Sequence, residues 1–275
     1  MSVRSERSAV GDTPPVIDVR NPAGSVAIEA AEGADELDVR VEALDADAED
    51  LLDRVEIDLT PPSDGHPARL RVAVPGPRFF RTPAFAVHVT TPVEARARVA
   101  VASADVSARG RLGALELTSA SGDLAVDHCA ALQLRSASGD ARIGTVSGDA
   151  VLGSASGDLR IERADGGLKA RTASGDVSVE SASGTVGVTT ASGEVAIAAL
   201  GEGRLRVKSV SGDVTVGVLP GLRVWLDLSS VSGRMDSQLE GDGPTTGAGA
   251  PQLSISIRSV SGDQNILRAA GAPLG

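Results

Sequence analysis

The chain has 275 residues, of which 41% are hydrophobic, so a real core can form in one elongated domain or two compact ones. Its net charge of −11 argues against attraction to phosphate backbones, and we expect no nucleic-acid partner. Aromatic residues make up only 1% of the chain, so Val, Leu, Ile and Ala must fill a narrow interior.

Residues 1–15 are predicted to be a disordered tail. This segment does not resemble a secretory signal, because no apolar run follows Arg4 and Arg7. No stretch of the chain approaches the ~20 consecutive apolar residues that are needed to cross a bilayer. We therefore expect a cytoplasmic protein that meets a membrane only peripherally, through a partner.

Residues 16–100 are predicted to form a β-rich cap that covers the first rung of the repeat that follows. Without such a cap, the open end of a stacked repeat would be an unpaired strand edge. Residues 46–53 fit a short helical turn, and Pro61-Pro62 and Pro75-Gly76-Pro77 mark loops. The expected strands are 16–19, 26–29, 37–41, 55–59, 70–74 and 85–89.

Residues 101–268 contain a repeat of about nine residues. After each corner, apolar and polar residues alternate, as in Val177-Ser178-Val179, which is the pattern of a half-buried strand. Glycines permit tight corners; those predicted to do so are Gly122, Gly139, Gly148, Gly157, Gly175, Gly184, Gly193 and Gly212. A Ser-Gly-Asp tripeptide or a close variant begins at Ser121, Ser138, Ser147, Ser156, Ser174, Ser183, Ser192, Ser211, Ser232 and Ser261.

Alternate corners of the repeat differ in charge, which favours two nonamers per turn. One set of corners is acidic at every level, whereas the other set is mixed; the acidic set is Asp105, Asp123, Asp140, Asp158, Asp176, Glu194 and Asp213. We therefore predict an all-β fold, a single-stranded parallel β-solenoid with about 18 residues and two short strands per turn.

The last rungs of the repeat have longer loops, notably residues 241–251. Trp225 is predicted to plug this end of the solenoid, and residues 269–275 are predicted to form a tail. The expected strands here are 222–228, 235–239, 253–257 and 266–267.

The sequence Thr172-Ala173-Ser174-Gly175-Asp176-Val177-Ser178-Val179 resembles the signature of the bacterial putative-adhesin β-strand-repeat family, also called the toastrack domain. Asn21-Pro22-Ala23-Gly24-Ser25-Val26 is similar to the beginning of that family, and the resemblance covers residues 15–268. It implies a parallel β-helical domain that is linked to bacterial cell-envelope stress systems and is often fused to, or encoded beside, membrane regulators. It implies no catalytic residues.

The acidic corners are the strongest candidates for ligand chemistry. Carboxylates stacked at strand spacing repel each other and attract a divalent cation, so the candidate Ca²⁺ ligands are Asp123, Asp140, Asp158, Asp176 and Asp213. Calcium-binding β-rolls also have a nonapeptide period, but they use Gly-Gly-x-Gly-x-Asp, whereas each unit here has one Gly directly before Asp. In the alternative reading, Ser and Asp side chains bond the backbone of the turn and of the neighbouring rung.

We expect no enzyme activity and no cofactor. Gly-x-Ser-x-Gly is absent, and His66, His88 and His128 fit no metal-ligand spacing. Cys129 lies in an aliphatic stretch and is predicted to be a small buried hydrophobe, and its neighbour His128 should point to the opposite face. Residues 112–216 have almost no insertions from which the walls of an active-site cleft could be built.

These observations favour a non-enzymatic scaffold or interaction module, linked to bacterial envelope stress or regulation, with an unidentified protein partner. The alternative is an adhesin-like module that binds a glycan or Ca²⁺. A homo-oligomer formed through the ends or faces of the solenoid is a further possibility, because repeat proteins expose long surfaces for docking.

Overall fold

The structure is a computed structural model that describes residues 2–63, 65–76, 82–239 and 252–269. The predicted loop at 241–251, Pro77 and nearly all of the predicted tail at 269–275 lie outside the described residues. The chain divides into two compact units, Met1–Ser147 and Gly148–Gly275. The predicted boundaries at residues 15, 100 and 268 remain predictions about domain organisation.

The first unit is built from strands that pair mainly in parallel. β2 lies between β6 and β8, and β3 lies between β7 and β9, all in parallel register. Three pairs are antiparallel: β1 with β4, β4 with β7, and β5 with β6. The strands are β1 (Val3–Ala9), β2 (Val16–Asn21), β3 (Gly24–Ala31), β4 (Glu36–Ala43), β5 (Glu56–Thr60), β6 (Arg69–Ala73), β7 (Phe85–Pro92), β8 (Arg96–Val101), β9 (Asp105–Ser119), β10 (Leu124–Ser136) and β11 (Ala141–Val146).

The six strands predicted before residue 100 are all present, and the helical turn predicted at 46–53 is α1 (Ala46–Glu49) with the 3-10 turn η1 (Leu52–Arg54). Asp45 is the N-cap of α1, and its Oδ1 accepts a hydrogen bond from the Ala48 N–H at 2.7 Å. The acidic run at the start of this segment therefore contributes a helix cap.

The prediction of a disordered tail at residues 1–15 is wrong, because β1 pairs along its length with β4. β1 is exposed or half-buried at every position, so it has no apolar alternation from which a strand could be predicted. Polar contacts hold it: the Arg4 guanidinium donates to the Val55 carbonyl at 2.6 Å, and Arg7 pairs with Asp38.

The second unit is made of parallel strands whose partners lie one repeat pair apart in the sequence. Leu159 pairs with Val177, and Val177 pairs with Val195, so successive partners are 18 residues apart. The strands are β12 (Ala150–Ser154), β13 (Leu159–Ala164), β14 (Leu168–Ser174), β15 (Val177–Ser192), β16 (Val195–Ser211), β17 (Val214–Val218), β18 (Val224–Ser232), β19 (Met235–Ser237), β20 (Leu253–Ser261) and β21 (Gln264–Arg268).

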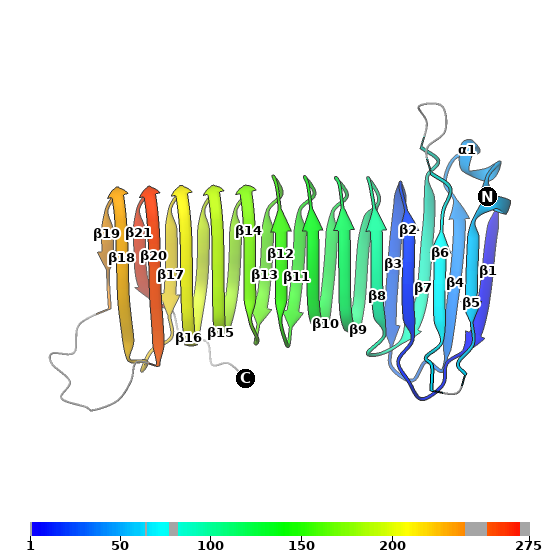
Figure 1. Cartoon of the computed structure of the whole chain (residues 1–275), viewed down its shortest axis with the longest axis horizontal. Helices are drawn as coiled ribbons and strands as arrows, with labels where there is room; N and C mark the ends of the chain where they lie inside the picture. Colours follow the sequence, from blue (N-terminus) through cyan, green and yellow to red (C-terminus); the bar gives the residue numbers. More distant parts are fainter. Residues whose placement is uncertain (1, 64, 77–81, 240–251, 270–275) are drawn as a thin grey trace. The chain divides into compact units, whose positions relative to one another are not determined.

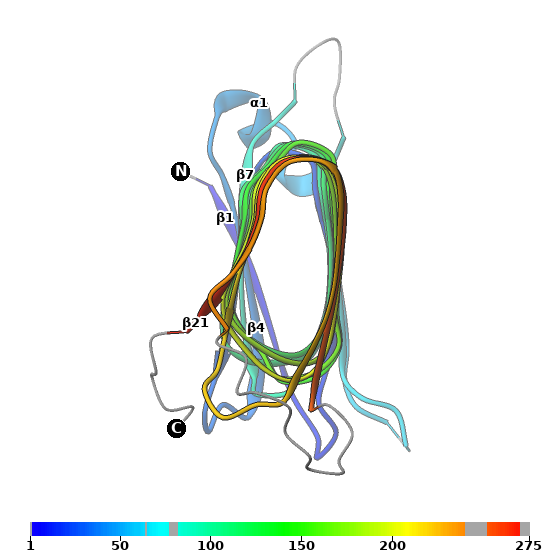
Figure 2. The same cartoon turned by 90° about the vertical axis from the view of Figure 1, so that its left-hand side faces the viewer.

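The strands of the second unit form two walls. Wall A consists of β12, β14, the later halves of β15 and β16, then β20 and β18. Wall B consists of β13, the earlier halves of β15 and β16, then β17, β21 and β19. β15 and β16 pass through a corner and contribute to both walls, and within this unit the backbone traces flattened loops in Figure 2.

The order of strands in wall A does not follow the sequence, because β20 lies between β16 and β18 (Figure 1). Leu205 of β16 pairs with Ile255 of β20, which in turn pairs with Leu226 of β18. Among the described strands, β18 pairs only with β20. Its inward residues Leu226 and Leu228 are consequently only half-buried.

The core consists of the aliphatic residues predicted from the repeat. The first and third residues after each corner are buried throughout; they are Leu124, Val126, Leu132, Leu134, Ala141, Ile143, Ala150, Leu152, Leu159, Ile161, Leu168, Ala170, Val177, Val179, Val186, Val188, Val195 and Ile197. Polar residues between them, such as Arg142 and Lys169, are exposed. Burial of this aliphatic set is the main source of stability, at about 25 cal/mol per Å² of apolar surface removed from water.

Candidate functional site

The acidic corners form ladders of side-chain to backbone hydrogen bonds. In the first unit, the Asp123 N–H donates to Asp105 Oδ1 at 3.0 Å, and the Asp140 N–H donates to Asp123 Oδ1 at 3.1 Å. In the second unit, the Asp176 N–H donates to Asp158 Oδ1 at 3.0 Å, and the Glu194 N–H donates to Asp176 Oδ1 at 2.8 Å. Each of these carboxylates therefore accepts the backbone N–H of the acidic residue one rung further along the chain.

Hydrogen bonds of the same kind recur at the last described rungs of the second unit. The Asp263 N–H donates to Asp213 Oδ1, and the Arg234 N–H donates to Asp263 Oδ1, both at 2.8 Å. Arg234 replaces the acid at the corner after β18, where no further described rung presents an N–H. The Ser-Gly-Arg variant thus marks the end of the ladder.

Two of the candidate Ca²⁺ ligands, Asp158 and Asp176, line a hollow of about 240 Å³ together with Glu194. Arg160 Nη2 lies 3.0 Å from Asp158 Oδ2 and supplies positive charge at this point. Within the described ranges, no group of three or more His, Cys, Asp and Glu side chains is arranged to hold a metal ion. Ca²⁺ binding by the acidic corners remains a prediction.

The corner glycines are required by close packing of one rung on the next. A Cβ built on Gly175 would overlap the carbonyl oxygen of Gly157, and one on Gly212 would overlap that of Gly193. Gly193 and Gly212 have positive φ, whereas Gly175 does not. At these corners the shared reason for glycine is therefore the approach of stacked backbones. At Gly184 a built Cβ would meet no atom closer than 3.4 Å, and the reason there is the positive φ.

The two kinds of corner, which the sequence separates by charge, also differ in the burial of the small apolar residue before them. This residue is exposed before the acidic corners, at Ala120, Ala137, Ala155, Ala173 and Ala191. At the other corners the equivalent residues, such as Val146 and Ala182, are buried.

At the acidic corners a Ser or Thr hydroxyl takes the inward position. Ser119 Oγ accepts the Gly122 N–H at 3.0 Å, and Ser136 and Ser154 bond the N–H of Gly139 and Gly157 in the same way. These hydroxyls cap the turn from inside. The observation that could have found them is that Ser or Thr occurs four residues before every acid of this set after Asp105, which has Val101 in that position.

Cys129 is fully buried, as predicted, and burial raises the pKa of its thiol from 9.0 to about 11. His128 is half-buried and its Nε2 lies 3.1 Å from Ser147 Oγ. The two neighbouring side chains point to opposite faces of β10, so the structure does not bring them together as a catalytic pair.

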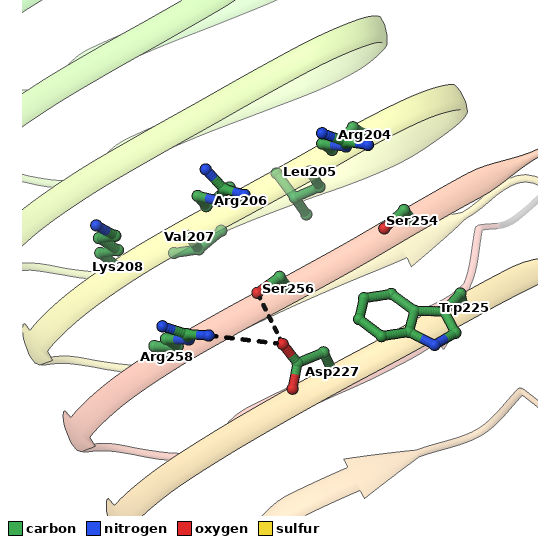
Figure 3. A pocket seen from close by; sticks show the side chains of 10 residues that line it. All are labelled: Arg204, Leu205, Arg206, Val207, Lys208, Trp225, Asp227, Ser254, Ser256 and Arg258. Carbon is green, nitrogen blue, oxygen red and sulfur yellow. Dashed lines mark hydrogen bonds and ion pairs between the residues drawn. The ribbon is translucent and has the colours of Figure 1, made fainter.

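A polar groove lies on wall A, and the sequence did not predict it. It has a volume of about 460 Å³ and lies over β16, β20 and β18 (Figure 3). β16 contributes Arg204, Arg206 and Lys208, which alternate with the buried Leu205 and Val207. β20 contributes Ser254, Ser256 and Arg258, and β18 contributes Trp225 and Asp227.

Trp225 is half exposed in this groove, so the prediction that it plugs the end of the solenoid is wrong. It alternates along β18 with Leu226, and it is the neighbouring Leu226 that faces inward. The side chain of Trp225 consequently lies on the outer face, beside Ser254, with which its backbone is in register (Figure 3).

The family model described as Toastrack DUF4097 matches residues 87–166 and 109–267. Together these two segments cover more than half of the chain. The chain belongs to the Toastrack family. The resemblance that the Ser-Gly-Asp repeat indicated is thereby confirmed.

The Toastrack chain is also similar to solved structures at low sequence identity. A protein from Parabacteroides distasonis described as "putative adhesin" is 12% identical, with 97% of each chain covered and a TM-score of 0.47. A second "putative adhesin", from Bacteroides fragilis, is 14% identical, covering 96% of this chain and 97% of that chain with a TM-score of 0.47.

A further structure from Parabacteroides distasonis, described as "Putative lipid binding protein", is 13% identical, with 96% of each chain covered and a TM-score of 0.43. No curated protein matches the Toastrack chain. Within its described ranges, no helix is both long enough and apolar enough to span a membrane.

Proposed function

We propose that the chain is a non-enzymatic scaffold or interaction module, linked to bacterial cell-envelope stress or regulation. In this proposal its strands coil as a parallel β-solenoid with about 18 residues and two short strands per turn. The pairing of strands in 18-residue register supports the coil. The link to the cell envelope is what membership of the Toastrack family leads us to expect.

The observation on which the interaction role rests is the alignment of outward side chains into rows. Because neighbouring strands of wall A are in register, Arg206 of β16 lies beside Ser256 of β20, which lies beside Asp227 of β18. Such rows recur at the spacing of strands, about 4.8 Å, and at alternate residues along each strand, about 6.8 Å. A rigid array of this kind offers a partner many fixed contacts with little loss of side-chain entropy.

The absence of catalysis is supported by the roles of the residues that could have been catalytic. Serine hydroxyls and carboxylates at the corners bond the backbone of their own or a neighbouring turn, as Ser119 and Asp176 do. Cys129 is held as a buried thiol. Side chains engaged in this way are poorly placed to act as nucleophiles.

The proposed location is the cytoplasm, with contact to a membrane only through the partner. Fractionation of the native host tests it: the full chain should be recovered in the cytoplasmic or peripheral membrane fraction. Recovery from the cell surface would instead favour the adhesin-like alternative.

Cross-linking in the native host tests the interaction role. The wild-type chain should cross-link to a specific protein, and Arg204→Gln/Arg206→Gln/Lys208→Gln should weaken this product. The control Arg69→Gln/Arg96→Gln/Arg142→Gln makes the same change in net charge at exposed arginines elsewhere. No specific cross-linked protein, or equal loss in both triple variants, would count against the proposal.

The alternative of a glycan-binding module is favoured by one observation, the exposed Trp225 in a groove of charged and hydroxyl side chains. Sugar-binding sites commonly combine an aromatic platform with groups that bond hydroxyls. A homo-oligomer through the ends or faces remains a third possibility, and light scattering over a range of protein concentrations would detect it.

A further inference from the structure

Most of the positive charge in the groove on wall A is not paired with an acidic side chain of the described residues. Arg204, Arg206 and Lys208 are exposed, and none of them forms an ion pair with a described residue. The carboxylate among the lining residues, Asp227, lies 4.0 Å from Arg258 Nη2 and accepts a hydrogen bond from Ser256 Oγ at 3.3 Å. Four cations and one carboxylate therefore face the groove, in a chain whose net charge is −11.

Register fixes where each of these groups lies. Arg204, Ser254 and Trp225 are side by side on adjacent strands, and the next outward row is Arg206, Ser256 and Asp227. Cations thus line one side of the groove, hydroxyls lie along the middle strand, and the indole and the carboxylate lie on the opposite side (Figure 3).

Each part of this arrangement matches one part of an acidic sugar. A half-exposed indole presents a flat apolar face on which a pyranose ring can stack. Ser254 and Asp227 can exchange hydrogen bonds with sugar hydroxyls, which both donate and accept. Arginine guanidinium groups bind carboxylates through two parallel hydrogen bonds.

We propose that the groove binds a carboxylated polysaccharide, such as a chain of uronic acids. The sugar rings lie along β20 between the indole of Trp225 and the guanidinium groups of β16, and their carboxylates pair with Arg204, Arg206 and Lys208. This inference rests on the alternative of a glycan-binding module, given above, and names the class of ligand for its groove.

The lining favours a polysaccharide over a polynucleotide. Asp227 repels the anionic groups of either polymer, but it can accept hydrogen bonds from the several hydroxyls that each sugar ring carries. With one aromatic residue in the groove, successive bases would lack the stacked platforms that single-stranded nucleic acids use.

Calorimetric titration of the full chain with an alginate hexamer tests the proposal, with a neutral maltohexaose in parallel. Binding of the uronate should weaken as salt is raised, and the neutral sugar should bind at least about tenfold more weakly. Equal affinity for the two sugars, or no binding of the uronate, would overturn the proposal.

Variants assign the binding to this groove. Arg206→Gln and Trp225→Ala should each weaken uronate binding by about tenfold, and Arg206→Lys should restore part of it. Arg142→Gln, at an exposed arginine of β11, should change the affinity less than about twofold. Circular dichroism and melting temperature verify that each variant is folded; equal losses in Arg142→Gln and Arg206→Gln would refute the site.

Two other polyanions complete the experiment. Oligo-dT and vesicles of phosphatidylcholine with phosphatidylserine should bind more weakly than the uronate at the same salt concentration. If oligo-dT or the vesicles bound more tightly than the uronate, the ligand of the groove would be a nucleic acid or a membrane, respectively, and the saccharide proposal would be refuted. If the cross-link to a host protein is found but the uronate does not bind, the interaction role is supported and the saccharide proposal is refuted. If neither the cross-link nor uronate binding is found, both proposals are refuted.

Discussion

Gly175 shows why single residues at the corners are critical. Its Cα faces the carbonyl oxygen of Gly157 one rung away, which leaves no room for a side chain. Gly187, on β15 of the same unit, has its nearest neighbouring atom 4.0 Å from a built Cβ. The repeat therefore contains some glycines that stacking requires and others that a larger residue could replace.

Gly175→Ala should lower the free energy of unfolding by about 1–3 kcal/mol, because the backbones must separate to admit the methyl group. Gly187→Ala is the matched control, with an expected change within about 0.5 kcal/mol. Urea unfolding monitored by circular dichroism measures both. Equal stability of the two variants would mean that the corner backbones are not in contact.

Asp176 distinguishes the structural reading of the acidic corners from the metal-binding one. Asp176→Asn keeps an oxygen for the Glu194 N–H and should change the stability little, whereas Asp176→Ala should cost about 1 kcal/mol. In the metal-binding reading, millimolar Ca²⁺ raises the melting temperature of the wild type above its value in chelator, and both variants reduce this rise. No difference between Ca²⁺ and chelator in the wild type would remove the Ca²⁺ hypothesis.

Cys129 predicts a specific loss of stability at alkaline pH. The pKa of the thiol rises from 9.0 to about 11 on folding, so the protonated form is favoured in the folded state. This difference in pKa contributes roughly 2–3 kcal/mol at most to the free energy of unfolding. The contribution is fully present below pH 9 and is lost as the pH rises towards 11.

Comparing the wild type with Cys129→Ala in urea unfolding from pH 7 to pH 11 isolates this effect. The stability difference between the two proteins should be constant to about pH 9 and then shrink. A difference that stays constant to pH 11 would show that Cys129 is not buried as a neutral thiol.

At the scale of elements, the arrangement of β16, β20 and β18 departs from sequence order. The contacts between corner glycines follow the same order as these strands. Gly262, after β20, faces the carbonyl of Gly212, after β16, and Gly233, after β18, faces the carbonyl of Gly262. β20 therefore has a partner on both sides, whereas β18 has one described partner.

Hydrogen exchange should reflect this order. Amides of 253–261 should exchange more slowly than those of 224–232, although they lie nearer the C-terminus, because buried strands with two partners open less often. Ile255→Ala, which removes buried side-chain volume between Leu205 and Leu226, should speed exchange of 224–232 and leave 168–174 unchanged. Val260→Ala, at an exposed position of β20, is the control. Faster exchange in 253–261 than in 224–232 would contradict the order.

The sequence predicted the positions of strands along the chain more reliably than it predicted which strands pair with each other. Apolar alternation located the strands and the inward positions, since burial depends on a local period. The same local pattern occurs in Val231-Ser232-Gly233 and Val260-Ser261-Gly262, so it could not show which strand lies in the middle. β1 was missed because it is held by polar contacts, and Trp225 because its facing depends on the phase of an irregular rung.

The candidate site was predicted less well than the fold. The acidic corners were identified, and the structure gives their side chains hydrogen bonds to the backbone. The groove on wall A was missed because its cations lie on β16 and its tryptophan on β18, and only the inserted β20 brings them to one surface.

At the scale of the whole molecule, the proposed coil of 18 residues is the property that would explain the strand pairing, the ladders and the surface rows together. In the second unit, corners 18 residues apart bond each other, as the Glu194 N–H bonds Asp176. Removing one complete coil should therefore leave every remaining rung in contact with an equivalent neighbour. Removing half a coil should instead move each strand after the deletion from its own wall to the opposite wall.

The most direct measurement compares the urea unfolding of two deletions, residues 177–194 and residues 177–185, by circular dichroism. The account predicts that the 18-residue deletion keeps the β spectrum and a cooperative transition, with a loss of at most a few kcal/mol in unfolding free energy. The nine-residue deletion should lose the cooperative transition. Equal stability of the two deletions would contradict an 18-residue coil.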